Sequence, residues 1–157
     1  MRGSVAIVVA GALVLAGVAA AAPTDRALVV RDADGGERLL TVDVDGGSNV
    51  TLAYTHSVER TPVRDVYAVT GTTLDNTGMR FQSYGWGLPS RADVRLVDGW
   101  FVFDPDRQYE RLHVQPAAVA NHQLYVDGEP HDLVALADGP VRITVERRAP
   151  LAGGLPR

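Results

Sequence analysis

Reactive side chains gather in two short segments of this chain. Residues 56–62 read HSVERTP and bring together an imidazole, a hydroxyl and a carboxylate, the groups of acid–base and nucleophilic chemistry. Residues 83–89 read SYGWGLP, where two glycines around a tryptophan indicate a backbone that bends sharply or is approached closely. Neither segment is a known catalytic motif. The candidate site residues come from both segments and from the strand after the first: His56, Ser57, Glu59, Arg60, Asp65, Tyr84, Gly85, Trp86, Gly87 and Pro89.

Apolar and polar residues alternate along residues 50–58, which predicts a strand. His56 falls on its apolar face, either as a core histidine bonded to a backbone carbonyl or as a pocket histidine that binds a ligand or senses pH. Ser57 falls on the other face without a G-x-S-x-G elbow, which argues against a serine hydrolase. On a regular strand the Glu59 side chain projects from the other face than His56. The two can act together as acid and base only if a bulge forms near Val58.

A turn is expected at Thr61 to Arg64, because Pro62 suits its second position. This register sets Arg60 opposite Asp65 and predicts a cross-strand ion pair between them. A solvated pair of this kind contributes under about 1 kcal/mol.

Trp86, between its two glycines, has two interpretations. It is a contact residue or lid over a pocket, or it sits on a bulge at the sheet edge and covers the core.

The elements that carry these residues are predicted to be strands, because helical periodicity is absent after residue 22. The fold class is all-β, either an antiparallel β-sandwich or a partly closed β-barrel of roughly ten short strands after an N-terminal apolar helix. Asp, Asn and Gly clusters separate the strands, among them a turn at residues 75–78. The candidate strands are residues 27–31, 38–44, 50–58, 63–70, 79–84, 94–97, 100–104, 109–114, 123–126, 132–136 and 141–147.

Residues 3–22 carry no charged side chain and follow Arg2, which is the pattern of an export segment. Residues 1–22 are therefore either a cleaved signal peptide or an uncleaved membrane anchor, with the rest outside the cytoplasm in both cases. Residues 23–148 are expected to form one β domain, and residues 149–157 a flexible C-terminal tail. The domain is then secreted or held at the outer face of the cell membrane.

The composition excludes several function classes. There is no cysteine, so disulfides, thiolate metal sites and cysteine nucleophiles are ruled out. An acidic balance without a basic cluster argues against nucleic-acid binding. All 15 basic residues are arginine, which fits a haloarchaeal source with a salt-adapted surface, or codon bias alone. The four histidines lie far apart without ligand spacing, and we expect no cofactor and no metal.

The two motifs, with Tyr67 on the strand between them, resemble the exported family called domain of unknown function 1850, a companion of TAXI-type TRAP transporter permeases. The resemblance covers about residues 28–145 and departs from the family where Trp86 replaces the usual alanine. The resemblance implies an association with a transporter rather than an enzymatic activity. By match of motif it singles out six residues: His56, Ser57, Glu59, Gly85, Gly87 and Pro89.

The expected function is that of a non-enzymatic, extracytoplasmic accessory domain of a TAXI-type TRAP transporter. Its partners are then the permease or the solute-binding protein, and the membrane through the N-terminal segment. Two alternatives stay open. One is a ligand- or metal-dependent hydrolase that uses His56 and Glu59, and the other is a structural interaction domain at the cell surface.

Overall fold

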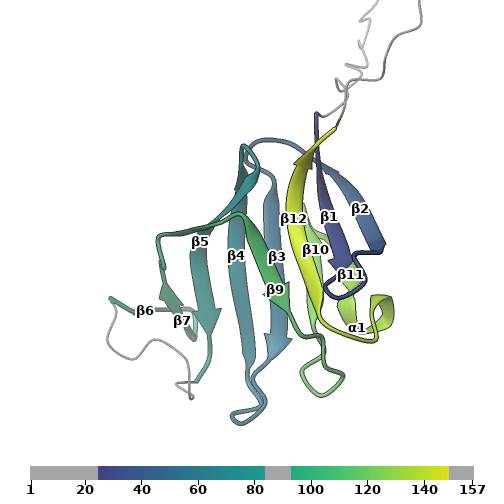
Figure 1. Ribbon diagram of the computed structural model, residues 1–157. Helices are drawn as coiled ribbons and strands as arrows, with labels where there is room; N and C mark the ends of the chain where they lie inside the picture. The colour runs from purple at the N-terminus through teal and green to yellow at the C-terminus, as the bar shows by residue number, and fades with distance from the viewer. Residues whose placement is uncertain (1–24, 84–92, 149–157) are drawn as a thin grey trace, which may run out of the picture.

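The computed structural model describes residues 25–83 and 93–148, and these form two antiparallel sheets packed face to face (Figure 1). The all-β prediction is confirmed. Of the two predicted architectures the sandwich is the one observed, because neither sheet closes on itself. Residues 1–22 and the tail 149–157 lie outside the described residues. Within the described ranges, no helix has the length and apolar content needed to cross a bilayer.

The smaller sheet has four strands and contains the first and last strands of the fold. Every neighbouring pair is antiparallel, and the central β1 buries four consecutive residues, 27–30. In sheet order the strands are β2 (Arg38–Val44), β1 (Arg26–Asp32), β12 (Val141–Arg147) and β9 (Arg111–Val114).

The larger sheet lies behind the smaller one in Figure 1. It has eight strands, and β8 pairs with β5 off the main path. In sheet order they are β11 (Glu129–Asp132), β10 (Gln123–Val126), β3 (Asn49–Thr55), β4 (Pro62–Thr70), β5 (Thr73–Phe81), β7 (Trp100–Phe103) and β6 (Arg95–Val97), with β8 (Arg107–Tyr109).

One hydrophobic cluster joins the inner faces of both sheets. Leu28 and Ile143 from the smaller sheet and Val50, Leu124 and Leu74 from the larger one are all at most 1% exposed. Burial of each such side chain stabilises the fold by about 1.5–3 kcal/mol. This core fixes which face of β3 and β4 points inward, and it thereby fixes the floor of the cleft described below.

The turn expected at residues 75–78 is wrong, because β5 already starts at Thr73 after a tight turn at residues 71–72. Residues 75–78 instead carry a β-bulge, where the partner of Val66 is Gly78 but the partner of Tyr67 is Asn76. Asn76 is 7% exposed, and its side-chain oxygen accepts the Gly78 N–H at 3.3 Å. The asparagine and glycine that favour a turn thus stabilise a bulge here.

The strand expected over residues 132–136 is also wrong. Asp132 ends β11 and caps a short helix, α1 (Leu133–Leu136). The Asp132 carboxylate accepts the N–H groups of Val134 at 2.9 Å and Ala135 at 3.2 Å, which satisfies donors that a helix start leaves free.

Candidate functional site

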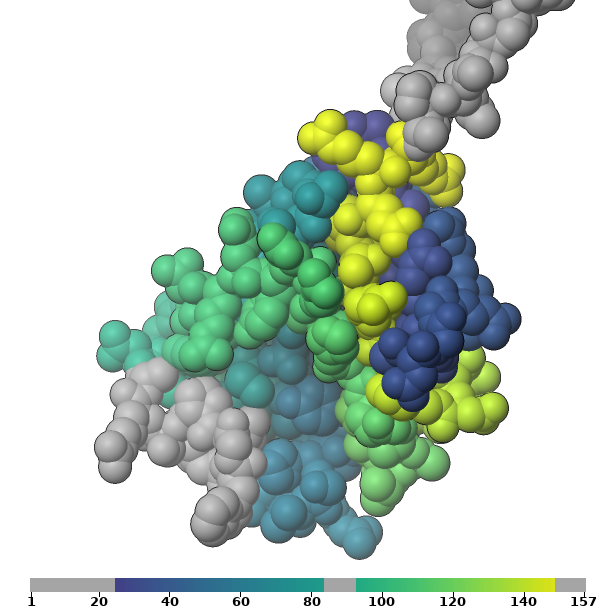
Figure 2. Space-filling view, in the orientation of Figure 1, coloured from purple at the N-terminus to yellow at the C-terminus, as the bar shows by residue number. Residues whose placement is uncertain are grey.

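A cleft of about 700 Å³ opens between the two sheets, beside the free edge of β9. The smaller sheet ends at β9, whereas the larger sheet continues beyond β4 to β5, β7 and β6. In Figure 2 the segment that contains β9 stands in front of recessed atoms of β3 and β4. Both sheets and the loop between β9 and β10 contribute residues to the lining. These are Leu52, Tyr54, Asp65, Tyr67, Tyr109, Arg111, Leu112, His113, Val114, Gln115 and His122.

Asp65 lies on the floor of the cleft, on the inward face of β4. The alternation of β4 points Val63, Asp65 and Tyr67 inward, and the register sets Asp65 opposite Leu52 of β3. The Tyr54 hydroxyl, one step along β3, hydrogen-bonds the Asp65 carboxylate. Burial raises the pKa of Asp65 to about 6, although the hydrogen bond from Tyr54 acts in the opposite direction. Asp65 makes no ion pair with any other residue of the described ranges.

Three tyrosines line the cleft together with this carboxylate. Tyr54 and Tyr67 come from the floor, and Tyr109 ends β8 and packs edge-on against Tyr67, with ring centroids 6.0 Å apart at 80°. Burial raises the pKa of both Tyr54 and Tyr67, and the nearby Asp65 charge adds to the effect. The two phenols therefore stay neutral and act as hydrogen-bond donors at physiological pH.

His122 forms the side of the cleft next to the loop before β10. Its ring stacks on Tyr54 with centroids 5.3 Å apart, and its Nδ1 accepts the Ala117 N–H at 3.2 Å. Burial lowers the pKa of His122, so the ring is neutral at pH 7. Because Nδ1 is an acceptor, the proton of the neutral ring is on Nε2.

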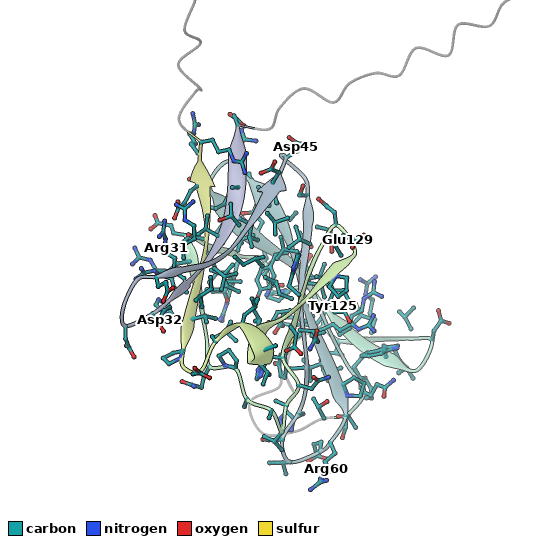
Figure 3. All side chains as sticks on the ribbon, turned by 90° about the vertical axis from the view of Figure 1, so that its right-hand side faces the viewer. Arg31, Asp32, Asp45, Arg60, Tyr125 and Glu129 are labelled. Carbon is teal, nitrogen blue, oxygen red and sulfur yellow. The ribbon has the colours of Figure 1, made fainter. Side chains whose placement is uncertain are left out.

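The predicted register of the β3–β4 hairpin is wrong. β3 ends at Thr55, which pairs with Pro62, and residues 56–61 form the loop. The His56 carbonyl accepts the Arg60 N–H at 2.8 Å, and Arg60 has a φ of +53°. This helical turn closes the hairpin before Pro62, so Leu52 rather than Arg60 lies opposite Asp65. Figure 3 shows Arg60 at the hairpin tip, pointing away from the sandwich.

Within this loop His56 and Glu59 are in contact, but not through their two side chains. His56 Nδ1 accepts the backbone N–H of Glu59 at 3.2 Å, while the Glu59 carboxylate accepts the Ser83 hydroxyl at 3.2 Å. The contact between His56 and Glu59 thus uses the Glu59 backbone. Ser57 is exposed at the same turn.

Asp65 is the one predicted site residue that the structure describes in the cleft; His56, Ser57, Glu59 and Arg60 lie in the hairpin loop. Tyr84, Gly85, Trp86, Gly87 and Pro89 lie outside the described residues. Sequence reasoning missed four functional candidates, Tyr54, Tyr67, Tyr109 and His122. The alternation that points Tyr54 inward was a usable signal for the first, whereas nothing in the sequence places His122 beside it.

The cleft holds two histidines, His113 and His122, from different segments. In the described ranges no group of three or more histidine, aspartate or glutamate side chains is placed to hold a metal ion.

A family model described as a domain of unknown function, DUF1850, matches residues 50–133. The matched segment begins in β3, ends in α1 and includes every lining residue of the cleft. No curated protein and no solved structure matches the chain.

Proposed function

The chain belongs to the DUF1850 family, and from that premise we propose that it is a non-enzymatic binding domain outside the cytoplasm, an accessory part of a TAXI-type TRAP transporter. The cleft beside β9 is its ligand-binding site. The observation that carries the binding role is the cleft itself, which is lined by three tyrosines and by Asp65, a carboxylate without an ion pair among the described residues.

The size and chemistry of the cleft support a small-molecule ligand. Its volume of about 700 Å³ falls within the range of roughly 300–1,000 Å³ that small-molecule pockets occupy. Leu52, Leu112 and Val114 supply apolar surface, and a few polar groups converge on the same space. Such a combination binds a ligand through its apolar body and orients it through hydrogen bonds.

A binding role is favoured over hydrolysis because the described lining lacks a serine, threonine or cysteine nucleophile. The hydrolase alternative through His56 and Glu59 gains little support, since Ser83 occupies the Glu59 carboxylate.

The export assignment rests on the uncharged residues 3–22. The two ends of the described fold support a tethered arrangement, because Arg26 pairs with Arg147 and the Arg148 N–H donates to the Asp25 carbonyl at 2.8 Å. In Figure 1 these ends lie opposite the β3–β4 hairpin. A tether at the N-terminus therefore leaves the hairpin end free for the permease or the solute-binding protein.

Co-purification tests the transporter role. The tagged full-length chain, expressed in its own host and recovered from gently solubilised membranes, should bring down a multi-span TRAP permease. A strain that lacks the chain should transport less solute. Recovery without transporter subunits, together with unchanged transport in the deletion strain, would overturn the proposal.

A matched pair of variants separates ligand binding from folding. Tyr109→Ala removes an aromatic wall of the cleft, whereas Tyr125→Ala removes a tyrosine of similar exposure from the outer face of β10. Tyr109→Ala should lower the transport supported by the domain, and Tyr125→Ala should not. Equal effects of both variants would exclude the cleft as the functional site.

A further inference from the structure

Asp65 is a half-buried carboxylate without a positive partner among the described residues. Its carboxylate accepts a hydrogen bond from a neutral tyrosine, Tyr54. A buried charge is costly unless a counter-charge compensates it. The site is thus electrostatically incomplete, and a positive group from outside would complete it.

The other charged and titratable groups of the cleft do not supply that positive charge. Arg111 stands at the rim: its side chain is 57% exposed, and its guanidinium lies 4.0 Å from Glu110. His122 is neutral because burial lowers its pKa. His113 is an exposed residue of the edge strand β9. Among the described lining residues Asp65 is the one carboxylate, and Tyr54, Tyr67 and Tyr109 line the same cleft.

Tyrosine rings strengthen the attraction for a cation. The face of an aromatic ring carries partial negative charge, which attracts a cation more strongly where both groups are desolvated. Three phenols around one carboxylate therefore favour a positive group over a neutral one of the same shape. A ligand that carries a carboxylate would instead be repelled by the charge of Asp65.

We propose that the cleft binds a small organic cation, whose ammonium group pairs with the Asp65 carboxylate between Tyr54, Tyr67 and Tyr109. This inference rests on the proposed binding function and assigns its ligand class. The ammonium can be primary or quaternary, because both bring the charge that Asp65 lacks. Leu52 and Leu112 contact the apolar part of the ligand.

The inference predicts a pH dependence with a defined sign. The pKa of Asp65 is raised to about 6, so its carboxylate is mostly ionised at pH 7.5 and mostly protonated at pH 5. The cation should therefore bind more weakly at pH 5. Tyr54 and Tyr67 have raised pKa values and stay protonated over this range. The other charged or titratable groups of the described lining are Tyr109, Arg111, His113 and His122.

The test compares cations with neutral molecules of the same shape. Calorimetry on the purified full-length chain at pH 7.5 uses two pairs of probes: choline with 3,3-dimethyl-1-butanol, and phenethylamine with 2-phenylethanol. At least one cation should bind about tenfold more tightly than its neutral partner. Asp65→Asn, which keeps the shape and removes the charge, should abolish the preference, and Tyr125→Ala should keep it.

The possible failures are distinguishable. If the neutral molecule binds as tightly as its cation, or if Asp65→Asn leaves the preference unchanged, the cleft is a ligand site but the ammonium assignment is wrong. If no probe binds while the chain still recovers the permease, the cation inference fails and the transporter role stands. Circular dichroism of Asp65→Asn confirms that a lost preference does not reflect unfolding.

Discussion

The Tyr54 hydroxyl hydrogen-bonds the Asp65 carboxylate across the neighbouring strands β3 and β4, on the floor of an open cleft. The bond supplies a donor to the carboxylate but no positive charge. Asp65 therefore remains costly to ionise in the folded chain, and this cost has consequences for both stability and binding.

The first prediction concerns stability and pH. The folded-state pKa of Asp65, about 6, lies above its ordinary value of 3.8, so the folded chain binds this proton more tightly than the unfolded chain. The stabilising contribution of the protonated group is then fully present below about pH 4 and is lost as the pH rises through 6. A shift of this size corresponds to about 3 kcal/mol of unfolding free energy.

Asp65→Asn should consequently be more stable than the natural chain at pH 7.5 and similar to it at pH 4. Urea unfolding at both pH values measures the difference, and the comparison cancels the titration of the other carboxylates. If the two proteins differ in unfolding free energy by the same amount at both pH values, the raised pKa of Asp65 is contradicted.

Tyr54→Phe removes the hydroxyl that binds Asp65. Because this hydrogen bond lowers the pKa of Asp65, its loss should raise that pKa further. It should also destabilise the chain at pH 7.5 by about 1–3 kcal/mol, since a charged acceptor loses its donor. Tyr67→Phe is the control, and it should move the pKa of Asp65 less. Equal shifts in an NMR titration of the carboxyl carbon would refute the pairing.

The cap of α1 is open to a separate test. Asp132→Ala leaves the N–H groups of Val134 and Ala135 without their side-chain acceptor. We expect a loss of about 0.5–2 kcal/mol in unfolding free energy. Asp138→Ala, at an exposed position just after the helix, should cost less. No difference between the two variants in thermal unfolding would argue against the cap.

Two arginines lie directly opposite each other on the outer face of the larger sheet, Arg64 on β4 and Arg80 on β5. Like charges in this position are destabilising, so Arg80→Glu should raise the unfolding free energy by about 0.2–1 kcal/mol at low salt. High salt should remove the gain. Arg95→Glu, on the edge strand β6, should not reproduce it. A gain that persists in molar salt would show a non-electrostatic cause.

Alternation predicted part of the fold well. The strands β2, β10 and β12 have the bounds that the pattern indicates, because each faces solvent on one side and the core on the other. It failed at residues 75–78, where Asn76 and Gly78 favour a turn locally but the pairing with β4 makes a bulge. Tertiary pairing, which the local pattern does not contain, decided that register.

The candidate site was less predictable than the fold. The sequence singles out Asp65 as a partner of Arg60, but the helical turn at His56 shifts the register, and Tyr54 becomes its partner. Tyr109 and His122 reach the cleft from segments far along the chain. Their approach depends on how the sheets pack, and no spacing in the sequence encodes it.

The decisive measurement is an NMR titration of the Asp65 carboxyl carbon in the full-length chain, with and without a saturating ammonium ligand such as choline. The structure predicts a pKa near 6 for the free chain, and linkage requires a bound cation to lower it. An ordinary carboxyl pKa near 4, unchanged by every ammonium probe, would contradict both the buried carboxylate and the cation site.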